Sequence, residues 1–137
     1  MDNSNQRLND VFFYGLYMDE EILKAKNVEP RNRRIAFAND YQLRIGNMAT
    51  LLRKKDSQAY GLVYSLTHDE VNVLYQKSGL TDYISESILV ELEDGSKIAT
   101  LSCILLNPPA SDESNLEYFK KLKLCMESYD LPVPTTV

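Results

Sequence analysis

Residues 35–65 have the sequence IAFANDYQLRIGNMATLLRKKDSQAYGLVYS, and this stretch decides the fold. Apolar runs rich in β-branched and aromatic residues alternate in it with short polar breaks, as strands alternate with turns. We expect four strands here, at Ile35–Ala38, Tyr41–Ile45, Met48–Leu52 and Ala59–Ser65. Because the breaks between them are short, neighbouring strands are expected to pair in antiparallel fashion.

The flanking sequence adds three more expected strands and three helices. The strands are expected at Val11–Tyr14, Tyr83–Leu92 and Lys97–Leu106. The helices are expected at about Asp19–Lys26, after a capping box at Thr67–Glu70, and at about Glu113–Tyr129. The basic residues Arg31, Arg33 and Arg34 are expected in a connection. About seven strands and three helices predict the α+β class, with a mainly antiparallel curled sheet or small β-barrel and flanking helices.

Length and charge limit the classes of protein that fit. A chain of 137 residues suits a single domain, expected at residues 10–130, with a disordered polar N-terminus at 1–9 and a C-terminal tail at 131–137. The net charge of −5 argues against a nucleic-acid partner. The sequence has no apolar run long enough for a membrane span and no secretory signal, so we expect no membrane partner and a cytoplasmic location.

Metal and cofactor chemistry find little support in the sequence. The two cysteines, Cys103 and Cys125, lie in apolar patterns and are expected to be buried free thiols. The single histidine, His68, is expected on the surface at the start of a helix. Motifs for nucleotide, metal or serine-hydrolase sites are missing. We therefore expect no metal and no cofactor.

The candidate binding site lies where the first strand ends, in the sequence FFYGLYM at residues 12–18. A strand that passes through a glycine into a helix start leaves backbone N–H groups without partners. Such groups can hold a carboxylate or a developing oxyanion. An ordinary strand-to-helix turn is the alternative interpretation.

This loop resembles the opening Tyr-Gly loop of the γ-glutamylcyclotransferase-like family, also called AIG2-like. The resemblance extends to IAFANDYQLRIG at Ile35–Gly46, to AYGLVYSLTHDEVNVLY at Ala59–Tyr75, and to Tyr83 at the start of the next strand. It covers about Val11–Leu106 and is greatest with the bacterial subgroup of that family.

The resemblance implies a barrel with a cavity that binds a small γ-glutamyl or other carboxylate ligand. Active members release 5-oxoproline when the substrate's own α-amine attacks its γ-carbonyl, with a carboxylate of the protein as base. The residues expected to contact the ligand are Tyr14, Gly15, Leu16, Tyr17, Met18 and Tyr83. Other tyrosines that could line a pocket are Tyr41, Tyr60, Tyr64 and Tyr75.

The chain departs from the family at the base. The pattern Glu-Gly-x-x-x-Tyr is replaced by Ser78–Tyr83, with Ser78 at the position of the glutamate. A serine hydroxyl is too weakly basic for this role, and loss of a general base costs about 10²–10⁴ in rate. Asp82 is a weak candidate for a relocated base. If Tyr83 lines the cavity, both Asp82 and Glu86 point to the opposite face of the strand.

Three functions therefore stay open. The first is an enzyme that forms 5-oxoproline from a γ-glutamyl amine. The second is a non-catalytic pseudoenzyme that binds a small carboxylate. The third is a module that binds protein through a sheet edge or a tyrosine-rich surface, which no feature of the sequence selects.

Overall fold

A computed structural model describes residues 7–110 and 112–133 of the chain. The strands are β1 (Leu8–Phe13), β2 (Arg31–Ile45), β3 (Ala49–Thr67), β4 (Tyr83–Leu92) and β5 (Lys97–Leu105). The helices are the short 3₁₀ helix η1 (Leu16–Met18), α1 (Glu20–Ala25), α2 (His68–Leu74) and α3 (Leu116–Ser128).

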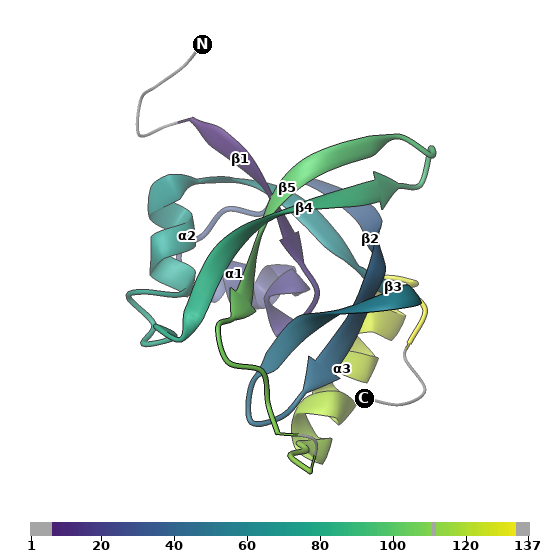
Figure 1. Ribbon diagram of the computed structural model, residues 1–137. Helices are drawn as coiled ribbons and strands as arrows, with labels where there is room; N and C mark the ends of the chain where they lie inside the picture. The colour runs from purple at the N-terminus through teal and green to yellow at the C-terminus, as the bar shows by residue number, and fades with distance from the viewer. Residues whose placement is uncertain (1–6, 111, 134–137) are drawn as a thin grey trace.

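The five strands form a closed barrel in the order β1-β3-β2-β4-β5, with helices outside it (Figure 1). All pairings are antiparallel except the one between β1 and β5, which closes the barrel at Val11 and Leu101. The buried hydroxyl of Ser102 reinforces this closure by donating to the carbonyl of Phe12 at 3.0 Å. The α+β class with a small barrel and flanking helices is confirmed.

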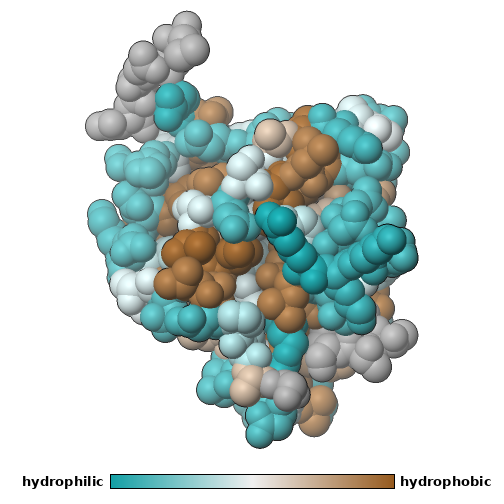
Figure 2. Space-filling model, in the orientation of Figure 1, coloured by the Kyte–Doolittle hydropathy of each residue, from teal (hydrophilic) through white to brown (hydrophobic). Residues whose placement is uncertain are grey.

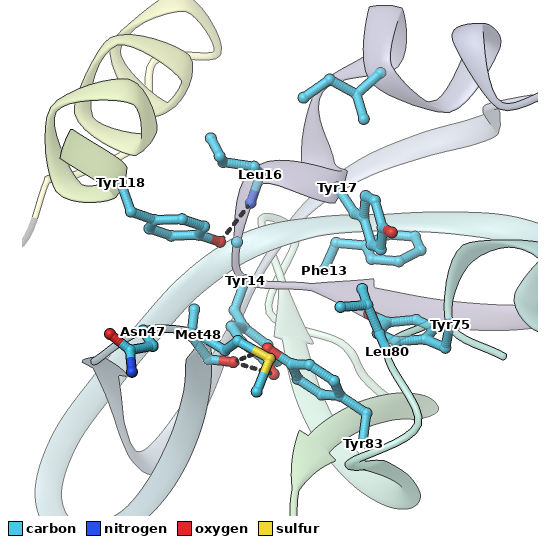
Figure 3. A pocket seen from close by; sticks show the side chains of 13 residues that line it. Phe13, Tyr14, Leu16, Tyr17, Asn47, Met48, Tyr75, Leu80, Tyr83 and Tyr118 are labelled. Atoms are coloured by element: carbon cyan, nitrogen blue, oxygen red, sulfur yellow. Dashed lines mark hydrogen bonds between the residues drawn. The ribbon is translucent and has the colours of Figure 1, made fainter. Parts of the chain in front are cut away.

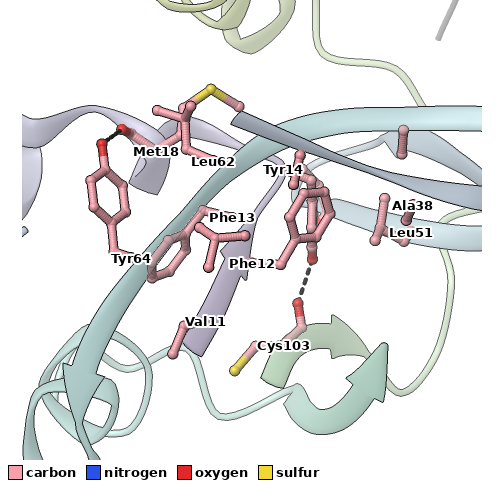
Figure 4. Close-up of a cluster of buried hydrophobic side chains, with 14 of the residues drawn as sticks. Val11, Phe12, Phe13, Tyr14, Met18, Ala38, Leu51, Leu62, Tyr64 and Cys103 are labelled. Carbon is pink, nitrogen blue, oxygen red and sulfur yellow. Dashed lines mark hydrogen bonds between the residues drawn. The ribbon is translucent and has the colours of Figure 1, made fainter. Parts of the chain in front are cut away.

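The core fills the barrel interior and the space beneath the helices. Phe12, Leu62 and Tyr64 are among its largest fully buried side chains, and Tyr64 donates its hydroxyl to the carbonyl of Met18 (Figure 4). At Gly61, an added Cβ would lie 2.1 Å from the carbonyl oxygen of Phe13. The close approach of β1 and β3 therefore requires glycine at that position.

The four strands expected between residues 35 and 65 are in fact one long hairpin. Asn39–Asp40 and residues 54–57 do not end strands, because they form an irregularity at which the register passes from Asn39↔Gln58 to Tyr41↔Arg53. Asp40 and Asp56 take positive φ angles of 63° and 65°, and the Asp40 carboxylate accepts from the Asp56 amide. A bulge of this kind bends a strand pair without breaking it.

Other boundaries also differ from expectation. β2 begins at Arg31, so the basic residues are part of a strand; Arg31 pairs with Glu70 and Arg34 with Asp10. β1 begins at Leu8, which pairs with Thr67, so residues 8 and 9 belong to the barrel. Leu131 is buried against α3 instead of lying in a tail. Residues 1–6 and 134–137 lie outside the described residues.

The helices expected from the sequence agree with the structure more closely than the strand boundaries do. The capping box is present: Glu70 donates its amide to Thr67 Oγ1, and its carboxylate accepts from the Thr67 amide. α3 spans Leu116–Ser128 within the expected range and buries Leu122 and Met126, whereas Leu116 is exposed. His68 lies on the surface. In the described part of the chain, none of the helices is long and apolar enough to cross a membrane.

Candidate ligand pocket

A pocket of about 300 Å³ opens at the end of β1 (Figure 3). It is lined by Phe13, Tyr14, Gly15, Leu16, Tyr17, Ile22, Asn47, Met48, Ala49, Tyr75, Leu80, Tyr83 and Tyr118. Its volume lies at the lower end of the range of about 300–1,000 Å³ that is usual for small-molecule sites. Thirteen residues from the end of β1, η1, α1, the hairpin turn with the start of β3, the α2–β4 segment and α3 thus converge on one hollow.

Five of the eight residues expected at the site lie together in this lining: Tyr14, Gly15, Leu16, Tyr17 and Tyr83. Met18 does not, because its side chain points into the core and is fully buried. Tyr75 also lines the pocket, while Tyr41, Tyr60 and Tyr64 lie elsewhere.

Ser78 and Asp82 are both outside the lining. The Ser78 hydroxyl donates to the carbonyl of Val73 at 2.7 Å and accepts from Lys26 Nζ at 3.3 Å. Asp82 is exposed to solvent in the turn that precedes β4. Tyr83, the first residue of β4, lines the pocket instead.

Hydrogen bonds hold the tyrosines that form the pocket floor. The Tyr14 hydroxyl donates to the carbonyl of Cys103, and the Tyr83 hydroxyl donates to the carbonyl of Ala49. On the opposite wall, Tyr17 donates its hydroxyl to the carbonyl of Leu74 at 2.6 Å. These side chains are fixed by backbone carbonyls from other elements, so the pocket walls are preorganised.

The expected loop amides are only partly open. The Leu16 amide donates to the hydroxyl oxygen of Tyr118 at 3.0 Å, and the Met18 amide donates to the carbonyl of Gly15 at 3.0 Å. Tyr118 therefore lies against the loop, where a Cβ on Gly15 would come within 2.5 Å of its hydroxyl. Glycine at position 15 leaves room for this tyrosine.

One tyrosine hydroxyl in the lining remains able to donate to a ligand. The Tyr118 oxygen accepts from Leu16, which leaves its own O–H proton free for another acceptor. The Tyr75 hydroxyl, in contrast, is hydrogen-bonded to the Cys103 thiol. The pocket therefore offers a neutral donor on an aromatic surface.

Burial determines the protonation state of the tyrosine hydroxyls in the lining. It raises the pKa of the hydroxyl above its ordinary value in Tyr14, Tyr17, Tyr75, Tyr83 and Tyr118. All five therefore keep their protons near neutral pH, and none can act as a phenolate base. Asp, Glu, His, Lys and Arg are absent from the lining residues that the structure describes.

The aromatic rings pack against one another along one wall. The Tyr17 ring meets Phe13 edge-on at 6.3 Å between centroids and meets Tyr75 edge-on at 5.4 Å. Tyr75 in turn lies 5.3 Å from Tyr83. Such contacts favour an apolar or aromatic ligand body.

Tyr118 is one of the lining residues that sequence reasoning missed, together with Ile22, Asn47, Met48, Ala49 and Leu80. It lies 102 positions from Leu16 in the chain, and its position in α3 carries no local motif. No three side chains among His, Cys, Asp and Glu of the described residues gather closely enough to hold a metal ion.

Comparison with solved structures places this architecture among known folds. A structure described as a gamma-glutamyl cyclotransferase matches with a TM-score of 0.77 and 19% identity, over 93% of this chain and 83% of that chain. The chain has the γ-glutamyl cyclotransferase fold. A yeast gamma-glutamyl cyclotransferase specific to glutathione matches with a TM-score of 0.64 and 14% identity, over 94% and 90% of the two chains.

Further structures share the γ-glutamyl cyclotransferase fold. An uncharacterized human protein matches with a TM-score of 0.76 and 19% identity, over 93% of this chain and 83% of that one. An AIG2-like mouse protein matches with a TM-score of 0.59 and 16% identity, over 81% and 90%. No protein-family model matches the sequence, and no curated protein matches it either. At these identities the likeness establishes the fold.

Proposed function

We propose that this protein binds a small molecule through a carboxylate or carbonyl oxygen in the tyrosine pocket, as a non-catalytic member of the γ-glutamyl cyclotransferase fold. The observation that carries the proposal is the composition of the lining, which has a neutral hydroxyl donor and no described side chain that could serve as a base. A carboxylate base in cyclotransfer must reach the α-ammonium of the substrate, and Ser78 and Asp82 lie outside the pocket.

The free Tyr118 donor suits an oxygen acceptor. Its O–H proton comes from α3, which packs against the loop after β1. A ligand oxygen that accepts from it would complete the hydrogen bonding of this hydroxyl, which otherwise only accepts from Leu16. The sequence resemblance supports the same class of ligand, because it implies a small γ-glutamyl or carboxylate compound.

Catalytic cyclotransfer is the second candidate, and the fold of the structural neighbours favours it. An active site here would have to work without a lining carboxylate. The expected membership of a subgroup that lacks the usual glutamate agrees with Ser78 at that position.

Two measurements on the purified protein separate the candidates. Thermal unfolding is followed with γ-glutamyl amines, 5-oxoproline and simple carboxylates, and the same compounds are assayed for release of 5-oxoproline. We expect ligand to raise the midpoint of unfolding in proportion to ln(1 + [L]/Kd), without turnover. Release of 5-oxoproline above the buffer rate would support the enzyme, and no shift with any compound would contradict binding.

A pair of variants locates the binding site. Leu80→Glu introduces a carboxylate into the lining, whereas Leu89→Glu introduces the same charge at an exposed position of β4 outside it. We expect Leu80→Glu to weaken binding of a carboxylate ligand at least tenfold, because like charges repel strongly in a partly buried site. Leu89→Glu should change affinity much less. Equal effects of the two variants would contradict binding in this pocket.

A further inference from the structure

The tyrosine pocket has a further property that concerns the charge of its ligand. Amino acids and γ-glutamyl amines carry an ammonium group beside their carboxylate. An ammonium has three N–H donors and accepts nothing, so in a pocket it needs acceptors and, above all, a negative charge. The contacts of the lining show how far it supplies acceptors and a negative charge.

Carbonyl acceptors at the pocket are already engaged. The Ala49 carbonyl accepts from the hydroxyl of Tyr83, and the Leu74 carbonyl accepts from Tyr17. In the loop, the Gly15 carbonyl accepts from the Met18 amide and the Leu16 carbonyl from the Asp19 amide. A carbonyl oxygen has two lone pairs, so an ammonium could share such acceptors, but the described lining offers it no negative charge.

A positive charge lies beside the tyrosine wall. Lys26 Nζ lies 6.0 Å from the centroid of the Tyr17 ring and is held there by its hydrogen bond to Ser78. A second cation would meet repulsion from Lys26. The edge-on contacts of Tyr17 with Phe13 and Tyr75 also cover ring faces that could otherwise form an open aromatic cage.

From these contacts we propose that the pocket selects carboxylates without a free ammonium group, such as N-acyl amino acids, cyclic amides of the 5-oxoproline type and 2-oxo acids, and rejects zwitterionic amino acids. This inference rests on the proposed function and names its ligand class. The ligand's oxygen faces Tyr118, and its apolar body lies against Phe13, Tyr17 and Leu80. Such a ligand makes the available hydrogen bond and brings no unpaired positive charge into the site.

The test uses ligand pairs that differ in the ammonium group. Phenylalanine is compared with N-acetylphenylalanine, and glutamate with 5-oxoproline, by calorimetric titration of the full chain at neutral pH. We expect the member without an ammonium group to bind at least tenfold more tightly in each pair. Equal affinities, or tighter binding of the zwitterions, would overturn the inference and leave the proposed function intact. If no compound binds, the proposed function fails and the inference fails with it.

A charge reversal in the lining gives an independent check. Leu80→Glu provides the missing negative charge, so it should shift the ratio of affinities towards the zwitterion by at least tenfold. Leu89→Glu, the same substitution at an exposed position of β4 outside the lining, is the matched control and should leave the ratio within about twofold of the wild type. An unchanged ratio in a folded Leu80→Glu protein would contradict the inference. If that variant does not fold, the ligand pairs on the wild-type protein still decide the question.

Discussion

Glu70 binds three residues through one carboxylate. It accepts from the Thr67 amide at 2.9 Å and from the Glu29 amide at 2.9 Å, and it pairs with Arg31 at 2.7 Å. Burial by itself raises the pKa of Glu70. The hydrogen bonds from Arg31 and the two amides outweigh burial, so the pKa lies below its ordinary value. The ionised form is therefore the one that stabilises the fold.

Glu70→Gln should lower the free energy of unfolding at pH 7 by about 1–2 kcal/mol, since it removes a half-buried charge-assisted bond. A carboxyl whose folded pKa is depressed contributes stability above its unfolded pKa, near 4.3, and loses it as the pH falls through the folded pKa. The difference between wild type and variant should thus shrink below about pH 4. Urea unfolding at several pH values measures it.

An exposed glutamate provides the control for Glu70. Glu127→Gln, on the exposed side of α3, should change the unfolding free energy at pH 7 by less than about 0.5 kcal/mol. A Glu70→Gln cost that is no larger than this, or that grows as the pH falls, would contradict the role of the ionised carboxylate.

Residues with a local signal were predictable from the sequence, and those with only long-range contacts were not. Thr67 and Glu70 form their capping box because the two residues are three positions apart, and the pattern predicts it. Tyr14, Gly15, Leu16 and Tyr17 were found from the strand–glycine–helix pattern. Tyr118 reaches the same pocket only because α3 packs against the loop, and nothing near Tyr118 in the sequence indicates that contact.

Among the elements, the β2–β3 hairpin shows where local rules fail. Asn39–Asp40 has the residues of a turn, and Asp40 does adopt a positive φ. The strands continue past it because Ala38 and Tyr41 on either side still pair with β3, so the pairing outweighs the local preference. β4, in contrast, spans Tyr83–Leu92 as predicted, since an Asp-Gly turn separates it from β5 and no irregularity interrupts it.

α3 fixes the loop after β1 through one hydroxyl. Tyr118→Phe removes the acceptor of the Leu16 amide and keeps the ring that packs there. We expect hydrogen exchange of the Leu16 amide to become at least tenfold faster, because a lost hydrogen bond permits local opening at lower cost. Proton–deuterium exchange followed by NMR measures it.

A second tyrosine hydroxyl, at the C-terminal end of α3, provides the control. Tyr129→Phe removes the hydroxyl that accepts from the Glu20 amide at 3.0 Å, so it should speed exchange of Glu20 and leave Leu16 unchanged. Faster exchange of Leu16 in both variants would indicate general loosening of α3 and would contradict a specific tie to the loop.

In the whole molecule, both cysteines report on the integrity of the barrel and its helices. Cys103 in β5 and Cys125 in α3 are free thiols and are less than one-tenth exposed. Burial raises the pKa of both thiols, that of Cys125 to about 11. Only the thiolate reacts with alkylating reagents, so the native protein should protect both sites.

We expect iodoacetamide at pH 8 to label each cysteine at least a hundredfold more slowly in the native protein than in denaturant. Labelling as a function of urea, read by mass spectrometry, should follow the same curve for both thiols, because a small domain opens cooperatively. If Cys125 is labelled well before Cys103, α3 detaches independently of the barrel, contrary to this expectation.

The distribution of apolar side chains over the surface is also a property of the whole molecule. Apolar side chains reach the face shown in Figure 2 in separate clusters divided by hydrophilic residues. Leu89 and Leu106 are among the exposed large ones. Single exposed apolar residues are common in globular proteins, so they give no particular support to a protein-binding module.

The position of β1 between β3 and β5 has a consequence for synthesis on the ribosome. β1 is translated before its second neighbour, β5, and before the Tyr118 that covers its loop. A nascent chain therefore holds the tyrosine-bearing loop in an unfinished sheet with open edges until α3 has been translated. Ligand cannot assist the early steps of folding, because its binding site forms only after β5 and α3 have packed around this loop.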